Sequence, residues 1–272
     1  MKDEGANTKR SMAQPRLNIT FPVLNEEAQL VSSIERTIGF CAANGIDVYE
    51  FCIADNGSTD RTGEIARDLA ARHARVRLVH LDRRGFGLAL KAAWARSDAD
   101  FVGYMDIDLA TDLSHLREVN ANICGDAPYD LYLGSRLASG ALVRNRSLLR
   151  GFLSRSFNAL LAWRLGISFT DATCGFKFIR RELYRQLEAS FPFSDDWFFV
   201  VELAVRAERA RARILDIPVT WTDQPHSKSS ARLVNLSLLY LAGISQLRRE
   251  IETKSAGSAA AAARVEDWRR GE

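Results

Sequence analysis

The sequence predicts an α/β fold in which helices flank a mostly parallel sheet. Short apolar runs typical of buried strands alternate with helical patterns through the first half of the chain. Three of these runs end at acidic residues, as in CIADNGSTDRT (52–62), where a buried run stops at Asp55 and a turn follows. The alternation favours right-handed crossovers, which bring the carboxyl ends of the strands to one edge of the sheet. That edge is where open α/β sheets bind ligands.

The expected elements follow one another in a regular order up to residue 135. Strands are predicted at 17–21, 49–54, 76–80, 101–106 and 131–135, and helices near 26–43, 59–74, 87–97 and 114–124. Beyond residue 140 the pattern predicts a helix at 147–165, a strand at 175–179, a helix at 197–209, a strand at 212–219 and a last amphipathic helix.

Composition indicates one large globular domain. The chain has 272 residues, of which 47% are hydrophobic and 26% charged. We assign 16–230 to the domain, 231–252 to the C-terminal amphipathic helix, and 1–15 and 253–272 to disordered segments. A net charge of +3 argues against nucleic acid as a partner.

The expected location is the cytoplasm. The four cysteines form no C-x-x-C pair, and the first residues have no apolar core typical of a signal peptide. No run reaches the roughly 18 apolar residues that a membrane span requires.

Acidic residues mark the ends of the strands. Asn25 and Glu26 follow the first strand, Asp55 ends the second, and Asp106 and Asp108 end the fourth. Positions i and i+2 of an extended chain point the same way, so the last two can address one ligand. Two carboxylates that leave coordination positions for diphosphate oxygens suit Mg²⁺ or Mn²⁺.

Each of these features also has a simpler explanation. Asp55 is predicted to hydrogen-bond a base or ribose, but it could equally cap the helix that begins near Thr59. A single D-x-D motif is weak evidence for a ligand site. Acidic residues at the ends of three strands are much less expected by chance. RRGFG at 83–87 lacks the third glycine of a dinucleotide fingerprint.

Seven motifs resemble those of the family 2 glycosyltransferases with the GT-A fold. In order they are FPVLNEE, IADNGSTD, RRGFGLALKAAW, MDIDLATDL, GSR, DATCGFK and WTDQPHSK, spread from Leu17 to Ser230. The last two are similar to the polyprenyl-phosphate (dolichyl-phosphate) hexosyltransferases, and CGFK resembles the glucosyl more than the mannosyl enzymes. The resemblance implies a Rossmann-like GT-A sheet with C-terminal amphipathic helices.

The resemblance also implies site residues. The nucleotide sugar would lie against Pro22, Asn25, Glu26, Asp55 and Asp106; the metal, Mg²⁺ or Mn²⁺, on Asp106 and Asp108; and the acceptor phosphate against Arg136, Arg150 and Lys228. Catalytic carboxylates would be Asp171 and Glu202. Val200 and Val201 replace an acid and a hydroxyl that many relatives carry before Glu202. Asp171 is therefore preferred, and Glu202 could instead pair with a nearby arginine.

The implied reaction is an inverting hexosyl transfer from a nucleotide sugar, with glucose from UDP-glucose favoured, to polyprenyl phosphate. Because a phosphate monoester has a second pKa of about 6, the acceptor needs no base. Asp171 would then orient the acceptor or the sugar. The alternatives are a soluble acceptor (peptide, glycan or natural product), transfer of mannose from GDP-mannose to polyprenyl phosphate, and a non-enzymatic nucleotide-sugar binder.

The segment 144–166 bears on the membrane. Apolar residues recur there at helical spacing, beside Arg144, Arg146, Arg150 and Arg155. A helix of this kind can lie in an anionic headgroup layer. It could equally be a core helix with a solvated basic face. We expect a peripheral protein on the cytoplasmic face of the membrane.

Overall fold

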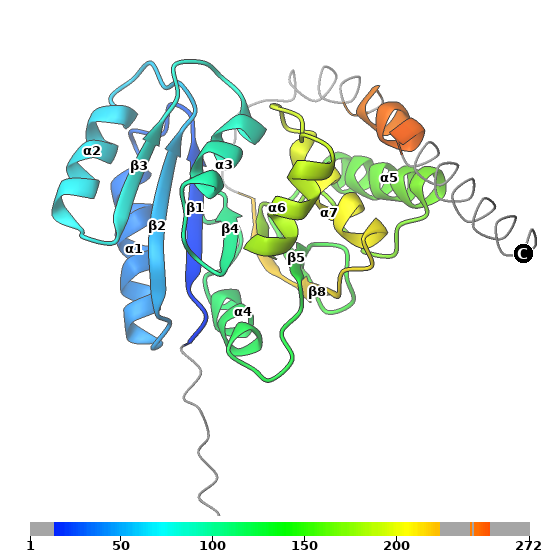
Figure 1. The fold of residues 1–272 in the computed structure, drawn as a ribbon, viewed down its shortest axis with the longest axis horizontal. Helices are drawn as coiled ribbons and strands as arrows, with labels where there is room; N and C mark the ends of the chain where they lie inside the picture. Colours follow the sequence, from blue (N-terminus) through cyan, green and yellow to red (C-terminus); the bar gives the residue numbers. More distant parts are fainter. Residues whose placement is uncertain (1–13, 224–239, 241, 251–272) are drawn as a thin grey trace, which may run out of the picture.

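A seven-stranded sheet with the order β3-β2-β1-β4-β7-β5-β8 forms the centre of the molecule (Figure 1). The computed structural model describes residues 14–223, 240 and 242–250. The strands are β1 (Leu17–Val23), β2 (Val48–Asp55), β3 (Val76–His80), β4 (Phe101–Met105), β5 (Leu131–Ser135), β7 (Phe176–Arg180) and β8 (Ile214–Pro218). The predicted strands are confirmed, with ends shifted by at most two residues.

Six of the seven strands run in one direction. β7 pairs antiparallel with both β4 and β5, whereas β1 is parallel to β2 and β4, β2 to β3, and β5 to β8. The carboxyl ends of the parallel strands therefore meet at one edge. The amino end of β7 reaches the same edge, so the loop before Phe176 lies among them. β1 and β4 are neighbours at the point where the strand order reverses, which is the usual ligand position in such sheets.

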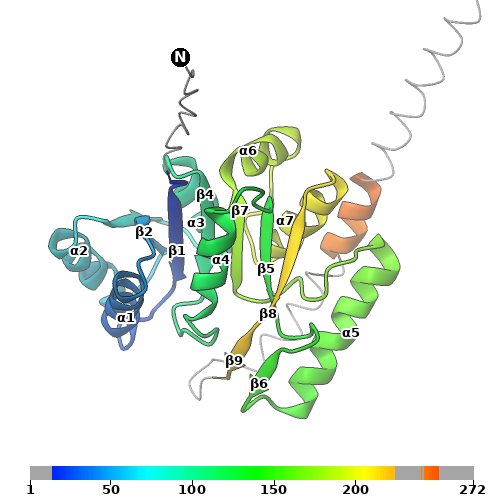
Figure 2. The ribbon, with the colours of Figure 1, turned by 90° about the horizontal axis from the view of Figure 1, so that it is seen from below.

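Helices cover both faces of the sheet (Figures 1 and 2). Buried side chains of α1 (Leu30–Ala43), α2 (Thr62–Arg72) and α4 (His115–Ile123) form one core. Those of α3 (Phe86–Ala95), α5 (Leu148–Leu165), α6 (Arg181–Ser190) and α7 (Phe199–Arg209) form the other. Trp94 of α3 is 1% exposed and packs between Tyr184 and Phe199, which joins α3, α6 and α7.

Three elements were not predicted from the sequence. α6 is mostly polar and buries only Tyr184, so it has few apolar residues to mark it in the sequence. β6 (Leu142–Arg144) and β9 (Thr220–Thr222) form a separate two-stranded parallel sheet, and three residues are too few to show an alternating pattern. β9 also forms an antiparallel bridge from Trp221 to Thr111, which places it beside the loop after β4.

The C-terminal predictions fall partly outside the described residues. Lys228 lies there, as do residues 231–239 of the expected helix and the segments 1–13 and 251–272. Within the expected helix, residues 242–250 are helical, and the Tyr240 ring stacks on Phe157 of α5 with 4.9 Å between centroids.

α5 divides into a covered half and an uncovered half. Toward its end, Leu161 and Leu165 are buried. At its start, Leu148 is 94% and Phe152 66% exposed, so part of the apolar stripe faces outward. The core-helix explanation is confirmed for the second half of α5, and the headgroup explanation stays a prediction for the exposed first half. Among the described helices, none is long and apolar enough to cross a bilayer.

Candidate active site

Asp55 lies at the end of β2 with no exposed surface. Its Oδ1 accepts a hydrogen bond from the Ser58 N–H (3.0 Å), and its Oδ2 lies 2.8 Å from His80 Nδ1. The carboxylate therefore closes the turn after β2 and ties it to the end of β3. It does not cap α2, where Asp60 Oδ1 accepts the Thr62 N–H. A contact between Asp55 and a nucleotide stays a prediction.

The loop after β1 is fixed to the loop after β2. Asn25 has a left-handed backbone (φ 57°), its N–H donates to Ser58 Oγ (3.0 Å), and its Oδ1 accepts the Thr59 N–H (2.8 Å). The Glu26 N–H donates to Thr62 Oγ1 (2.8 Å). These bonds fix the position of Glu26 near Asp106. The negative charge of Glu26 helps to raise the pKa of the Asp106 carboxyl. Pro22 precedes them in β1, paired with Ala54.

A third loop joins this rim through Asn56. Its Oδ1 accepts the Gly85 N–H (2.5 Å) at the start of α3. An amide oxygen accepts a hydrogen bond as a carboxylate oxygen would. Asparagine at position 56 can therefore make the same contact with the Gly85 N–H that an aspartate would make. The ends of β1, β2 and β3 thus form one hydrogen-bonded rim.

Asp106 and Asp108 follow β4 as predicted. The Asp106 N–H donates to the Gly175 carbonyl (3.1 Å), and a Cβ on Gly175 would lie 1.8 Å from Asp106 Oδ2. Only glycine allows this approach. Burial, with the Asp108 charge, raises the pKa of Asp106 to about 7. Burial also raises the pKa of Asp108, and the Asp223 charge adds to the effect.

These two carboxyls fit a divalent metal. Both pKa values are raised, so the ionised pair is electrostatically unfavourable until a cation neutralises it. The described residues contain no group of three or more possible metal ligands. Two carboxylates would leave several positions for water and diphosphate oxygens, which is how Mg²⁺ is usually held.

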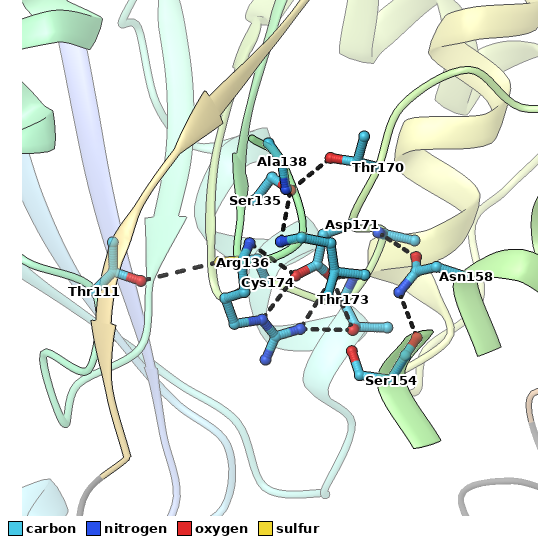
Figure 3. Close-up of polar contacts among 12 residues, drawn as sticks. Thr111, Ser135, Arg136, Ala138, Ser154, Asn158, Thr170, Asp171, Thr173 and Cys174 are labelled. Atoms are coloured by element: carbon cyan, nitrogen blue, oxygen red, sulfur yellow. Dashed lines mark hydrogen bonds and ion pairs between the residues drawn. The ribbon is translucent and has the colours of Figure 1, made fainter. Parts of the chain in front are cut away.

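A second charged centre lies at the end of β5 (Figure 3). Arg136 donates from Nε to Asp171 Oδ2 (2.7 Å) and from Nη2 to Asp171 Oδ1 (2.9 Å). Nη2 also reaches Thr173 Oγ1 (2.9 Å). The Arg136 side chain is 10% exposed. This bidentate geometry fixes the plane of the guanidinium.

Asp171 has no exposed surface, and the expectation that it orients the acceptor or the sugar stays a prediction. Burial alone would raise its pKa, but the Arg136 charge and hydrogen bonds hold that pKa well below its usual range. Its oxygens are bound by Arg136 and Thr173. Such a carboxylate stays ionised and accepts no proton at working pH. Asp171 therefore positions Arg136.

Two further arginines, Arg146 before α5 and Arg150 in its first turn, lie near this pair. Arg150 Nη1 donates to Asp223 Oδ2 (2.8 Å). The guanidinium carbons of Arg136 and Arg146 lie 5.6 and 5.4 Å from the centre of the Trp221 ring. β9, which carries Trp221, bridges to the loop after Asp108. β9 thus connects the loop that carries the acidic pair with the arginines around Trp221.

Glu202 belongs to a different network. Its Oε2 accepts from the Ser194 N–H (2.8 Å) and hydroxyl (2.6 Å), and its Oε1 pairs with Arg206 (3.1 Å). Ser194 begins the stretch whose Asp196 carbonyl accepts the Gly87 N–H of α3 (3.1 Å). This supports the arginine-pair alternative, in which Glu202 stabilises the fold around the start of α3.

Sequence reasoning missed two polar groups of this site. Lys177 is fully buried, its Nζ donates to the Cys174 carbonyl (2.5 Å), and burial lowers its pKa to about 8. Its positive charge lowers the pKa of Asp106 and so opposes the effect of burial on that carboxyl. Ser154 Oγ is buried beside Asn158 and has no hydrogen-bond partner among the residues that the structure describes (Figure 3). Lys177 could have been noticed in the sequence, because it is the lysine of the CGFK motif. A serine within a helix, such as Ser154, has no sequence feature that marks it.

Comparison with known sequences identifies the family to which these motifs belong. The profile described as glycosyl transferase family 2 matches residues 19–188, from β1 into α6. AglD of Haloferax volcanii, named a glycosyltransferase, is 34% identical over 217 residues, which are 78% of this chain but 34% of that protein. The chain therefore spans about a third of that relative's length.

Two further relatives match over most of their length. Dolichyl-phosphate beta-glucosyltransferase ALG5C of Trichomonas vaginalis is 27% identical, with 85% of this chain and 74% of that protein covered. Polyprenol monophosphomannose synthase of Mycolicibacterium smegmatis is 29% identical, with 82% and 84% covered.

Solved structures share the fold. Glucosyl-3-phosphoglycerate synthase from Mycobacterium tuberculosis, in complex with Mn²⁺, UDP and phosphoglyceric acid, superimposes with a TM-score of 0.63 at 22% identity, covering 87% of this chain and 79% of that one. The predicted fold class is thereby confirmed. Since the family profile covers more than half of the chain and includes the strand ends that build the site, this protein belongs to glycosyl transferase family 2.

Proposed function

We propose that this protein transfers a hexose from a nucleotide sugar to polyprenyl phosphate, with inversion at the anomeric carbon, and that glucose from UDP-glucose is its preferred donor. One observation carries the proposal: the arginines beside Trp221 lead directly into α5, whose first turns expose Leu148, Leu149 and Phe152. A cationic site next to an outward apolar surface suits an acceptor with an anionic head and an apolar tail. The names of the dolichyl- and polyprenol-phosphate relatives support the same acceptor.

The donor would lie along the edge of the sheet, at the carboxyl ends of β1, β2 and β4. Asp106 and Asp108 would hold Mg²⁺ or Mn²⁺, and the metal would supply positive charge to the leaving diphosphate. Mn²⁺ and UDP in a neighbouring structure agree with this choice. Pro22, Glu26 and Asp55 would flank the nucleoside, Asp55 through the turn that it closes with Ser58.

The acceptor phosphate would lie against the arginines. One of its oxygens attacks the anomeric carbon, the bond from that carbon to the diphosphate breaks, and the nucleoside diphosphate leaves with the electron pair. Because the phosphate is largely dianionic at neutral pH, no residue has to remove a proton. Arg136, held by Asp171, orients the phosphate for this attack.

The proposal is tested by incubating the protein and Mn²⁺ with UDP-glucose, UDP-galactose, GDP-mannose or GDP-glucose, each with farnesyl phosphate, and by weighing the products. We expect farnesyl phosphoglucose from UDP-glucose. Mannose transfer from GDP-mannose would replace the donor assignment and leave the acceptor class intact. Transfer to farnesol or a water-soluble alcohol in preference to farnesyl phosphate would overturn the proposal in favour of a soluble-acceptor enzyme.

We further propose that the first half of α5 rests in the headgroup layer. Its exposed apolar residues lie close to the exposed Arg144 and Arg155. The double change Arg144→Glu with Arg155→Glu should lower co-sedimentation with anionic phosphatidylglycerol vesicles several-fold at low salt, because each basic residue near such a surface contributes about 1 kcal/mol. The difference should shrink in 0.5 M salt, where screening is strong.

A matched control reverses two exposed arginines on other helices, Arg36 of α1 and Arg117 of α4. This variant has the same net charge and should bind vesicles as the unchanged protein does. Equal losses in the two double variants would mean that only net charge matters and that α5 is not the docking element.

A further inference from the structure

Arg146 differs from Arg136 and Arg150 in forming no ion pair with a carboxylate of the described residues. Arg136 is paired with Asp171 and Arg150 with Asp223. Within the residues that the structure describes, Arg146 forms no ion pair, and its Nε is buried without a hydrogen-bond partner. A buried guanidinium N–H left unsatisfied costs free energy, more than a neutral group would.

The position of Arg146 makes this cost larger. Its guanidinium shares the Trp221 ring with Arg136, so two like charges lie around one indole. The ring's quadrupole stabilises each cation to some extent. Burial, together with the Arg136 charge, nevertheless lowers the pKa of Arg146. The described part of the chain thus holds a partly desolvated positive charge in place and pairs it with no carboxylate.

An anion at this point would satisfy the unpaired group. The charges of Asp171 and Asp223 reach Arg146 only at a distance, since each is bonded to another arginine. Trp221 also connects this point to the loop after Asp108 through its bridge to Thr111. An anion between Arg146 and Arg136 would therefore lie on the side of the site that faces the proposed metal and the leaving group.

We propose that Arg146 is a further phosphate-binding residue of the acceptor site, and that its guanidinium, oriented on Trp221, donates hydrogen bonds to a phosphate monoester. The inference rests on the proposed function, since it names how the acceptor of that reaction is recognised. Arg136 and Arg150 each give part of their five N–H groups to a carboxylate and can offer others to the phosphate. Arg146 has no such partner among the described residues, so it can offer the phosphate its whole guanidinium.

The test measures binding of farnesyl phosphate and farnesol to the full chain by isothermal titration calorimetry. Arg146→Gln should weaken farnesyl phosphate binding about 10- to 100-fold, the range for one charge-assisted hydrogen bond. Farnesol binding and Mn²⁺-UDP binding should change by less than about twofold, since no phosphate monoester is involved. Arg146→Lys should recover part of the loss, because it keeps the charge but not the planar fork.

Arg144→Gln is the matched control. Arg144 is exposed on β6, two residues away, and the change removes the same charge. On soluble farnesyl phosphate without vesicles it should leave the dissociation constant unchanged. Unchanged Mn²⁺-UDP binding by Arg146→Gln also establishes that this variant is folded.

The outcomes separate this inference from the proposed function. If the unchanged protein binds farnesyl phosphate no more tightly than farnesol, the acceptor assignment itself is wrong. If it prefers farnesyl phosphate and Arg146→Gln keeps that preference, the role of Arg146 alone is overturned. A variant that loses Mn²⁺-UDP and keeps farnesyl phosphate would assign Arg146 to the donor diphosphate, which also overturns the proposal.

Discussion

Asp108→Asn is expected to lower turnover by about 10³-fold, which corresponds to roughly 4 kcal/mol of transition-state stabilisation. The metal's charge acts mainly on the diphosphate that forms as the glycosidic bond breaks, so its loss should reduce kcat more than donor binding. The fold should persist, because the amide can still accept the Ala110 N–H that Asp108 Oδ1 accepts (3.0 Å). Initial rates with Mn²⁺ at saturating UDP-glucose measure the effect.

The control for this variant is Asp112→Asn. Asp112 lies exposed in the same loop and caps the turn before α4 through the Ser114 N–H (2.8 Å). It carries the same charge but does not belong to the acidic pair, so turnover should change by less than twofold. Full activity of Asp108→Asn, or of the unchanged protein in EDTA, would contradict the metal assignment.

Asp171→Asn should lower the free energy of unfolding by about 3–5 kcal/mol, the cost of leaving one member of a buried ion pair without its partner. The remaining charge is that of Arg136, whose side chain is 10% exposed. The acceptor KM should rise as well, because Arg136 loses the carboxylate that fixes its plane. Urea unfolding gives the first quantity and initial rates give the second.

The double variant Asp171→Asn with Arg136→Gln separates the two effects. Removing both charges should restore part of the stability, but not the acceptor KM. If the free energy of unfolding of Asp171→Asn lies within about 0.5 kcal/mol of that of the unchanged protein, the ion pair contributes little to stability.

The stability difference between Asp171→Asn and the unchanged protein should also depend on pH. Arg136 holds the pKa of Asp171 below its unfolded value, which is about 3.9. A depressed folded pKa means that the stabilisation is fully present above the unfolded pKa and is lost as pH falls toward the folded one. The difference should be constant from pH 8 to about pH 5 and should decrease below pH 4.

Local sequence pattern was enough to predict the sheet and the acidic residues at its edge. Buried strands have short apolar runs bounded by turns, and such runs ended at Asp55 and Asp106. Since parallel strands place their carboxyl ends together, local pattern was enough to bring these acids to one edge. The acidic pair at 106 and 108 needed no knowledge of distant contacts.

The partners of the remaining side chains could be found only from contacts between distant parts of the chain. Asp171 and Glu202 are both acids beside apolar residues in the sequence, but one binds Arg136 across 35 positions and the other binds Ser194 and Arg206 of its own neighbourhood. Arg146 looked like any arginine of a basic helix until Trp221, 75 positions later, was placed against it. Ion pairs and ring contacts depend on distance in space and on burial, and neither quantity is written in the local spacing of residues.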